Sequence, residues 1–307
     1  MRNKIAVIGA GNVGATLALY LAQKELGDLA LIDINKNMAK GKALDIMQAG
    51  AVFGFDTRIE ASDDYEIIKG AKLVLVTAGF PRKPGMDRLE LLHINRDIID
   101  GIAANIKKYA PDSIVIVVSN PVDVMTYRMW KQTGFPSERV MGQAGVLDTG
   151  RYLSFLAEKT GLNVKNIQSM ILGGHGDTMV PVESWTRISG ADIKEFVSQS
   201  DLDTVGKRAQ NGGGEIVTLL QTGSAYYAPA AATALMAESV LKDEKKLLPV
   251  ACLPKKGEYG IKDIYIGLPA VIGANGVEKI LELKLGSEEM KKLTDSAAIY
   301  LKSVAEL

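Results

Sequence analysis

The chain has 307 residues, of which 47% are hydrophobic and 23% charged, so it has the composition of a folded globular protein and not of a disordered or fibrous one. Lysine plus arginine and aspartate plus glutamate both number 36, which leaves no broad basic surface to attract nucleic acid or anionic lipid. One cysteine and two histidines exclude an intramolecular disulfide and argue against a metal site, and we expect a cytoplasmic protein with no metal, nucleic-acid or membrane partner.

The first 140 residues alternate short, β-rich apolar runs with longer segments of helical period, which is the pattern of parallel βαβ units in an open, doubly wound sheet. The apolar run nearest the amino terminus, residues 5–9, is too short to form the core of an export signal. Strands are predicted at 4–8, 29–33, 73–77 and 114–118, and crossover helices at 15–26 and 89–109.

A glycine-rich turn follows the first strand directly: residues 9–14 read Gly-Ala-Gly-Asn-Val-Gly, and Asp33 ends the next strand 19 positions beyond Gly14. Gly9 permits a tight turn, Gly11 lets a pyrophosphate approach the backbone, and Gly14 lets the helix pack closely on the strand. The N–H groups at the start of the helix attract the anion. The turn predicts a dinucleotide cofactor, bound by Gly9, Gly11, Asn12, Val13, Gly14 and Asp33.

Asp33 bears on the choice between the two nicotinamide cofactors. A carboxylate at the end of the second strand can accept hydrogen bonds from the adenosine ribose and would repel a 2′-phosphate, so NAD is expected over NADP. Lys36 lies three positions further along and keeps NADP open as an alternative.

From about residue 145 the parallel rhythm ends, which predicts an NAD-binding Rossmann domain over 1–143 and a mixed α+β substrate and catalytic domain over 144–307, tightly packed on each other. The uncharged stretch 216–237 contains Pro229 and several polar residues, so it is interpreted as part of a buried helix pair and not as a membrane span. Helices are expected at 149–159, at 202–242 with a break near 226–229, and at 287–305. Strands are expected at 168–172, 180–188, 247–253 and 264–272, the last two in an antiparallel meander around a turn at 258–260.

His175 is the main candidate for chemistry, because glycines at 173, 174 and 176 flank it at the end of an apolar strand and leave its ring open to a cleft. An imidazole suits proton exchange near neutral pH while a hydride moves to or from a nicotinamide. His93 has no such frame and lies inside a helical pattern, so it is interpreted as a packing or surface residue.

Four further segments, read in order after the glycine turn, closely resemble those of the lactate/malate dehydrogenase family, and the resemblance covers essentially the whole chain. They are AGFPRKPGMDR at 78–88, SNPVD at 119–123, VLDTGR at 146–151 and GGHGD at 173–177. The first of them resembles the branch of lactate-dehydrogenase-like malate dehydrogenases. The resemblance implies an NAD-dependent enzyme of the tricarboxylic acid cycle that interconverts (S)-malate and oxaloacetate, assembled as a homotetramer, with a dimer as the alternative.

The resemblance also implies roles for single residues. His175 is the implied acid/base, Asp148 would bind the other nitrogen of its ring, and Arg151 would grip the C1 carboxylate of the substrate with its two-pronged guanidinium. From spacing alone, an ordinary i,i+3 ion pair between Asp148 and Arg151 is an equally good interpretation. Asn120 would lie near the nicotinamide and the substrate oxygen, although Asn-Pro is also a common turn.

The loop at 80–88 bears on the choice of substrate. By resemblance, Arg88 polarises the reacting carbonyl and Arg82 selects the substrate, where the lactate branch usually has an uncharged residue. A cation there would be buried without a partner against a methyl group, at a cost of about 3–5 kcal/mol, but paired against a second carboxylate. A dicarboxylate substrate is therefore expected.

Three other functions compete with this one. The nearest is a lactate or broad-specificity 2-hydroxy-acid dehydrogenase. A nicotinamide-sensing module without chemistry is opposed by the presence together of His175, Asp148, Arg151 and Arg88. A short-chain, sugar-modifying oxidoreductase would need a Tyr-x-x-x-Lys pair, and none stands in the expected context.

Two small-residue segments are less defined. The run Asn-Gly-Gly-Gly at 211–214 could bind a second phosphate, but a kink or a close backbone approach is the favoured interpretation. Gly223 and Ser224 resemble the wall that the family places opposite the substrate.

Overall fold

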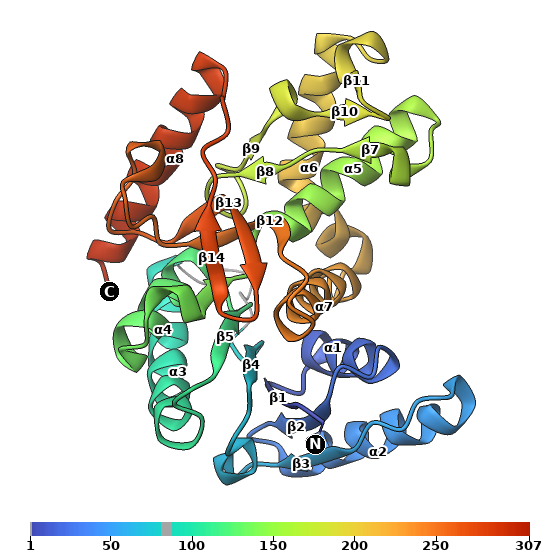
Figure 1. Cartoon of the computed structure of the whole chain (residues 1–307), viewed down its shortest axis with the longest axis vertical. Helices are drawn as coiled ribbons and strands as arrows, with labels where there is room; N and C mark the ends of the chain where they lie inside the picture. The colour runs from blue at the N-terminus through green and yellow to red at the C-terminus, as the bar shows by residue number, and fades with distance from the viewer. Residues whose placement is uncertain (1, 81–87) are drawn as a thin grey trace.

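The computed structural model in Figure 1 describes residues 2–80 and 88–307 of the chain. In the described part of the amino-terminal half, six parallel strands lie in the order β3-β2-β1-β4-β5-β6 with helices on both faces. This is the Rossmann order, and it confirms the predicted fold class. The elements are β1 Lys4–Ile8, α1 Asn12–Gln23, β2 Asp28–Ile32, α2 Lys36–Phe53, β3 Ile59–Ser62, β4 Leu73–Val76, α3 Arg88–Tyr109, β5 Ile114–Val117, α4 Val122–Thr133 and β6 Val140–Gly142.

Both faces of the parallel sheet are buried, which is why its strands read as continuous apolar runs. Along β1, Ile5 and Val7 face the core shared with α1, α2 and α7, whereas Ala6 and Ile8 face the core shared with α3 and α4. The four predicted strands match the observed ones to within one residue at either end. The two predicted crossover helices match α1 and α3, with α1 beginning three residues earlier than predicted.

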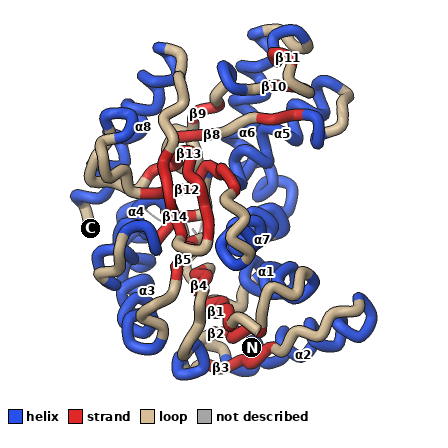
Figure 2. Tube along the Cα trace, in the orientation of Figure 1, coloured by secondary structure: helices blue, strands red, loops and turns tan. Residues whose placement is uncertain are grey.

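The carboxyl-terminal half adds an antiparallel meander to the same sheet. In the described residues, nine strands run in the order β14-β13-β12-β6-β5-β4-β1-β2-β3, and β12 pairs with β6, which joins the meander to the parallel strands. In Figure 2 the strands of both halves, in red, lie between the helices, in blue. The elements are α5 Gly145–Thr160, β7 Ile167–Gln168, β8 Ile171–Leu172, β9 Val180–Pro181, β10 Arg187–Ile188, β11 Ala191–Asp192, α6 Gln199–Leu220, α7 Tyr227–Leu241, β12 Lys246–Cys252, β13 Ile266–Gly273, β14 Gly276–Ile280 and α8 Ser287–Ala305.

Two predicted strands are wrong. Each of the segments 168–172 and 180–188 splits into two short strands that join different sheets: β8 pairs with β9, whereas β7 pairs with β10. Pro181 cannot donate to a ladder, and a 3-10 turn at Glu183–Trp185 separates β9 from β10. The apolar runs thus continue through a change of direction that the residue pattern does not mark.

The predicted helix pair is present, but it is not buried throughout: α7 is mostly buried from Pro229 on, whereas the end of α6 is exposed. The break falls at 221–226, slightly before its predicted place, where Gln221 and Gly223 have positive φ; Pro229 lies in the first turn of α7, where a missing N–H leaves no bond unmade. Val217, Leu219 and Leu220 at the end of α6 are exposed. No helix in the described ranges is both long and apolar enough to cross a membrane.

An ion pair joins α1 of the first half to α7 of the second. Glu238 accepts from Lys24 and from Lys242, both at 2.8 Å, and its side chain is 12% exposed. Hydrogen bonds from the two lysines lower the pKa of Glu238 from 4.5 to about 2. A carboxyl with a lowered pKa in the folded state contributes stability above its unfolded pKa and loses it as pH falls towards the folded value.

Glu238→Gln should therefore lower the free energy of unfolding at pH 7 by about 1 kcal/mol, a modest effect because both lysines are half exposed. The difference from wild type should shrink as the pH falls from 4.5 towards 2. Urea unfolding at pH 7, 4 and 3 measures it. Glu288→Gln, which removes the exposed pair with Lys292, is the control and should change little. An equal deficit at pH 7 and pH 3 would show that packing, not charge, is lost.

Candidate active site

The three glycines of the turn at 9–14 have three different surroundings. Gly9 has φ +102°, and a Cβ there would lie 2.7 Å from the backbone nitrogen of Ala78. A Cβ at Gly14 would lie 1.8 Å from the carbonyl oxygen of Gly9, so this residue permits the contact of helix with strand. Gly11 has open space around it and is the N-cap residue of α1, with no side-chain hydrogen bond to the helix start. The open backbone and the uncapped helix start fit a bound pyrophosphate.

Asp33 lies at the end of β2, and the turn holds its carboxylate in place. Its Oδ2 accepts from the Ala10 N–H at 2.7 Å and its Oδ1 from the Asn35 N–H at 2.9 Å. Each oxygen keeps a second lone pair, so the carboxylate can still accept from a ribose diol. Lys36 forms an ion pair with Asp63 at 2.9 Å. The residues present therefore fit NAD.

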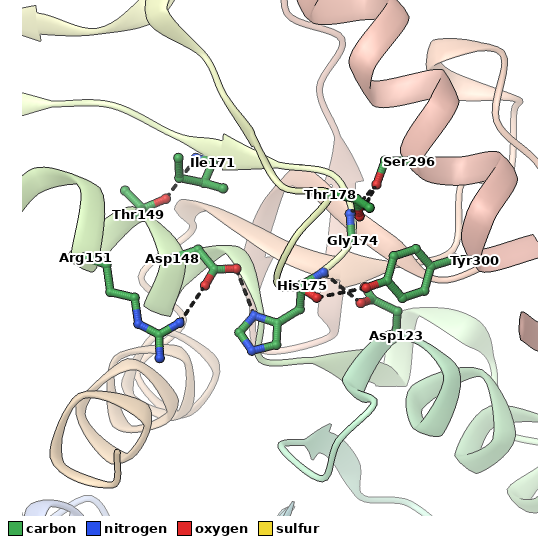
Figure 3. A network of polar contacts seen from close by, with 10 residues as sticks. All are labelled: Asp123, Asp148, Thr149, Arg151, Ile171, Gly174, His175, Thr178, Ser296 and Tyr300. Carbon is green, nitrogen blue, oxygen red and sulfur yellow. Dashed lines mark hydrogen bonds and ion pairs between the residues drawn. The ribbon is translucent and has the colours of Figure 1, made fainter. Parts of the chain in front are cut away.

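His175 stands in the loop after β8, and its ring contacts a buried carboxylate (Figure 3). Nδ1 lies 2.8 Å from Oδ2 of Asp148, whose side chain is 2% exposed. An ionised carboxylate partner requires the proton on Nδ1, which leaves Nε2 to exchange a proton. Among the described residues nothing bonds to Nε2. The predicted contact between these two side chains is present.

Arg151 completes a chain of three groups. Asp148 and Arg151 lie in the first two turns of α5, and Nη1 of Arg151 donates to Oδ1 of Asp148 at 3.2 Å. The i,i+3 ion pair thus exists, and it holds the guanidinium in the same cluster as the His175 ring. An ion pair between Arg151 and Asp148 is compatible with binding of a substrate carboxylate by Arg151, because one arginine has five N–H groups.

The glycine run at 211–214 lies against this arginine. It neither kinks α6, which continues unbroken to Leu220, nor begins a helix where a phosphate could bind. A Cβ at Gly212 would lie 3.2 Å from Cδ of Arg151, and one at Gly213 would lie 3.4 Å from its Nη2. The structure therefore has neither a kink nor a close approach of two backbones here; Gly212 and Gly213 instead leave room for the side chain of Arg151.

Burial and charge act in opposite directions on His175. Burial disfavours its protonated ring, but the carboxylates of Asp148 and Asp123 outweigh burial and the opposing charge of Arg151, so the pKa of His175 is raised above 6.5. The ring is thus held ready to be protonated near neutral pH, as an acid/base at a redox site requires.

A cavity of about 530 Å³ lies beside His175, and Asn120 and Tyr300 are in its wall. The carbonyl of Asn120 accepts from Nδ2 of Asn95 at 2.8 Å, and Oδ1 of Asn95 accepts from the Phe80 N–H at 2.6 Å. Asn95 thus ties Asn120 to the start of the segment that follows β4. It was missed from the sequence, although a polar residue on the inward face of helix 89–109 was a signal.

Other predicted site residues are placed less closely. Arg82 lies outside the described residues, and of Arg88 the structure gives the backbone only, as the first residue of α3. His93 is exposed on α3, in agreement with its interpretation as a surface residue. Gly223 and Ser224 are exposed in the break between α6 and α7 and do not line the cavity beside His175.

Comparison with known proteins agrees with this arrangement. The lactate/malate dehydrogenase NAD binding domain matches residues 3–142, and the lactate/malate dehydrogenase alpha/beta C-terminal domain matches 145–307. A malate dehydrogenase from Roseiflexus sp. (strain RS-1) is 50% identical over 307 residues, with 100% of this chain and 99% of that protein covered. Malate dehydrogenase 1 from Anaeromyxobacter dehalogenans (strain 2CP-C) is 49% identical, with 99% and 98% covered.

Two solved structures superpose equally well. The apo malate dehydrogenase from Picrophilus torridus has a TM-score of 0.96 at 39% identity, with 99% of this chain and 97% of that chain covered. The lactate dehydrogenase from Cryptosporidium parvum, complexed with lactic acid and nicotinamide adenine dinucleotide, also has a TM-score of 0.96 at 39% identity, with 99% and 98% covered. The backbone alone therefore does not separate the two activities.

Substitution at Gly11 and at Gly14 should separate cofactor binding from packing. Gly14→Ala should destabilise the cofactor-free protein by about 2 kcal/mol or more, because its Cβ meets the Gly9 carbonyl. Gly11→Ala should leave the melting temperature of the free protein near wild type but weaken NADH binding about tenfold, because its Cβ occupies open space at the helix start. Calorimetry and fluorescence titration with NADH measure the two effects. Unchanged NADH affinity in Gly11→Ala would place the pyrophosphate elsewhere.

Proposed function

This chain belongs to the lactate/malate dehydrogenase family, and from that premise we propose that it is an NAD-dependent malate dehydrogenase that interconverts (S)-malate and oxaloacetate. The proposal rests on the His175–Asp148–Arg151 cluster, which joins an acid/base to a fixed cation and whose His175 lines the cavity. Curated relatives about half identical over the full chain are malate dehydrogenases, which supports the choice within the family.

Different residues of the chain bind the substrate and transfer the proton. Bound NAD would supply the hydride acceptor for oxidation of the alcohol carbon, and NADH the hydride donor for reduction of the carbonyl. Nε2 of His175 takes the hydroxyl proton in oxidation and gives it back in reduction. Asp148 fixes the ring tautomer and stabilises the cation that forms, while Arg151 grips the C1 carboxylate and so orients the reacting carbon.

Three more side chains are proposed to act on the substrate. Arg82 binds the distal carboxylate, Arg88 polarises the reacting carbonyl, and Asn120 contacts the substrate oxygen and the nicotinamide. Asn120 in the cavity wall beside His175 supports its part. The turn residues Gly9, Gly11, Asn12, Val13 and Gly14 hold the pyrophosphate, and Asp33 holds the ribose.

Finer properties belong to the same proposal. We propose a division into a cofactor domain over 1–143 and a catalytic domain over 144–307, a place in the tricarboxylic acid cycle, a cytoplasmic location and no nucleic-acid or membrane partner. We also propose a homotetramer, with a dimer as the alternative. The exposed apolar side chains of Leu44, Val52 and Phe53 on α2 support association of copies, because contact between copies would remove such side chains from water.

The nearest competing activity is that of a lactate or broad 2-hydroxy-acid dehydrogenase. A solved lactate dehydrogenase superposes on this chain as well as a malate dehydrogenase does. With NADH, kcat/KM for oxaloacetate should exceed that for pyruvate by a few hundredfold or more, the factor that corresponds to an unpaired buried charge of about 3–5 kcal/mol. His175→Asn should lower kcat about 10²-fold or more, while its affinity for NADH stays near that of wild type. That result would show that turnover depends on this site. Equal use of pyruvate would favour the competing activity.

Arg82→Gln should remove most of the preference for oxaloacetate over pyruvate, because it removes the cation proposed to bind the distal carboxylate but keeps a polar side chain of similar reach. The ratio of the two kcat/KM values should change about a hundredfold. Arg88→Gln is the control and should depress both substrates together, since both present the same carbonyl. A change of less than about threefold in Arg82→Gln, with folding intact by circular dichroism, would remove Arg82 as the specificity residue.

A further inference from the structure

The main chain of His175 is held from two sides by side chains of two different helices (Figure 3). Oδ2 of Asp123, from α4, accepts from the His175 N–H at 3.0 Å. The hydroxyl of Tyr300, from α8, donates to the His175 carbonyl at 2.8 Å. A loop residue bonded through its N–H to a buried side chain and through its C=O to a half-buried one has little freedom to move.

Helix α8 also fixes the residue before His175. A Cβ at Gly174 would lie 1.8 Å from the ring of Tyr300, so the ring packs directly on this glycine. Oγ of Ser296 accepts from the Gly174 N–H at 2.9 Å and bonds to Oγ1 of Thr178 at 2.8 Å. The glycines beside His175 therefore admit the side chains of α8 and do more than leave the imidazole uncovered.

Asp123 is unusual because one of its oxygens is buried without a partner. The residue is 1% exposed, Oδ2 has the His175 N–H, and Oδ1 has no hydrogen-bond partner in the described part of the chain. A buried carboxylate that is only half satisfied costs stability. The cost is offset at an acid/base site if the carboxylate faces a group that becomes cationic, as the ring of His175 does when it is protonated.

We propose that Asp123 and Tyr300 are positioning residues for His175, and that the carboxylate of Asp123 also stabilises the protonated ring from the side opposite Asp148. This inference rests on the proposed function only in giving His175 the acid/base role. The two carboxylates differ in their contacts: Asp148 bonds to the ring itself, whereas Asp123 bonds to the main chain and acts on the ring through its charge.

The charged groups around this pair come from three elements and the loop. Burial raises the pKa of Asp123 to about 6, a hydrogen bond from the His175 N–H and the histidine charge oppose that rise, and the charge of Asp148 adds to it. Arg151 of α5 opposes protonation of His175. Asp123, Asp148 and Asp177 all add to the burial that raises the pKa of Tyr300, so its hydroxyl stays protonated and keeps donating.

A histidine titration tests the charge of Asp123 without any catalytic assay. The chain has two histidines, so protein labelled with ¹³C-histidine gives two NMR titration curves, with exposed His93 as internal reference. Asp123→Asn should lower the midpoint of His175 relative to wild type and leave that of His93 in place. Asp295→Asn removes an exposed carboxylate of α8 and should move neither. An unmoved His175 midpoint in Asp123→Asn would show that Asp123 is uncharged beside the ring and overturn its electrostatic role.

Kinetics with oxaloacetate and NADH test the positioning. Asp123→Asn keeps an oxygen for the His175 N–H, so kcat should stay near wild type at pH 6, but the ratio of kcat at pH 6 to that at pH 9 should grow about threefold or more, because the protonated ring is lost earlier as pH rises. Asp123→Ala loses the acceptor as well, and its kcat should fall about tenfold at every pH.

Tyr300→Phe removes the hydrogen bond to the His175 carbonyl without changing a charge. It tests the positioning role even if an Asp123 variant fails to fold. Its kcat should fall severalfold with KM for oxaloacetate little changed, and its His175 midpoint should stay near that of wild type. A kcat equal to wild type in both Tyr300→Phe and Asp123→Ala would overturn the positioning role. If the wild-type protein did not reduce oxaloacetate, the proposed function would fail, while the NMR arm would still decide the interaction of Asp123 with His175.

Discussion

The hydrogen bond between Asp148 and His175 constrains much of the second half of the chain. A carboxylate that is almost fully buried must have partners, and its partners come from a loop 27 residues away and from the next turn of its own helix. Helix α5 can bring Asp148 to that loop only because it begins at Gly145, where a Cβ would lie 2.7 Å from the Ile171 carbonyl and 2.7 Å from Pro249. The contact between Asp148 and His175 thus depends on the close packing of these three segments.

The two ends of the active site come from different halves of one sheet. The amino-terminal half supplies the open turn at Gly11 and the fixed carboxylate of Asp33, and the carboxyl-terminal half supplies His175, Asp148 and Arg151. Asn120 follows β5 and lies between them in the cavity wall. Cofactor recognition is therefore local in sequence, whereas the acid/base cluster depends on tertiary packing.

This difference explains what could be predicted from the sequence. Parallel strands buried on both faces give unbroken apolar runs, and the glycine turn with Asp33 is a local pattern, so both were identified. Resemblance supplied the contact of His175 with Asp148. Asp123 and Tyr300 meet His175 across 52 and 125 positions, and no local pattern indicates such contacts. The strands at 168–172 and 180–188 were misjudged because two-residue strands take their direction from distant partners.

The pairing of β12 with β6 has a consequence for conformational change. A Cβ at Gly142 of β6 would lie 2.9 Å from Cβ of Ala251 in β12, so the two halves pack closely where these strands pair. A rigid-body hinge between them would have to break this ladder and separate Lys24 from Glu238. Opening and closing around ligands is therefore expected in segments that connect strands and not by rotation of domains, and the rates of ligand exchange should depend on those connections alone.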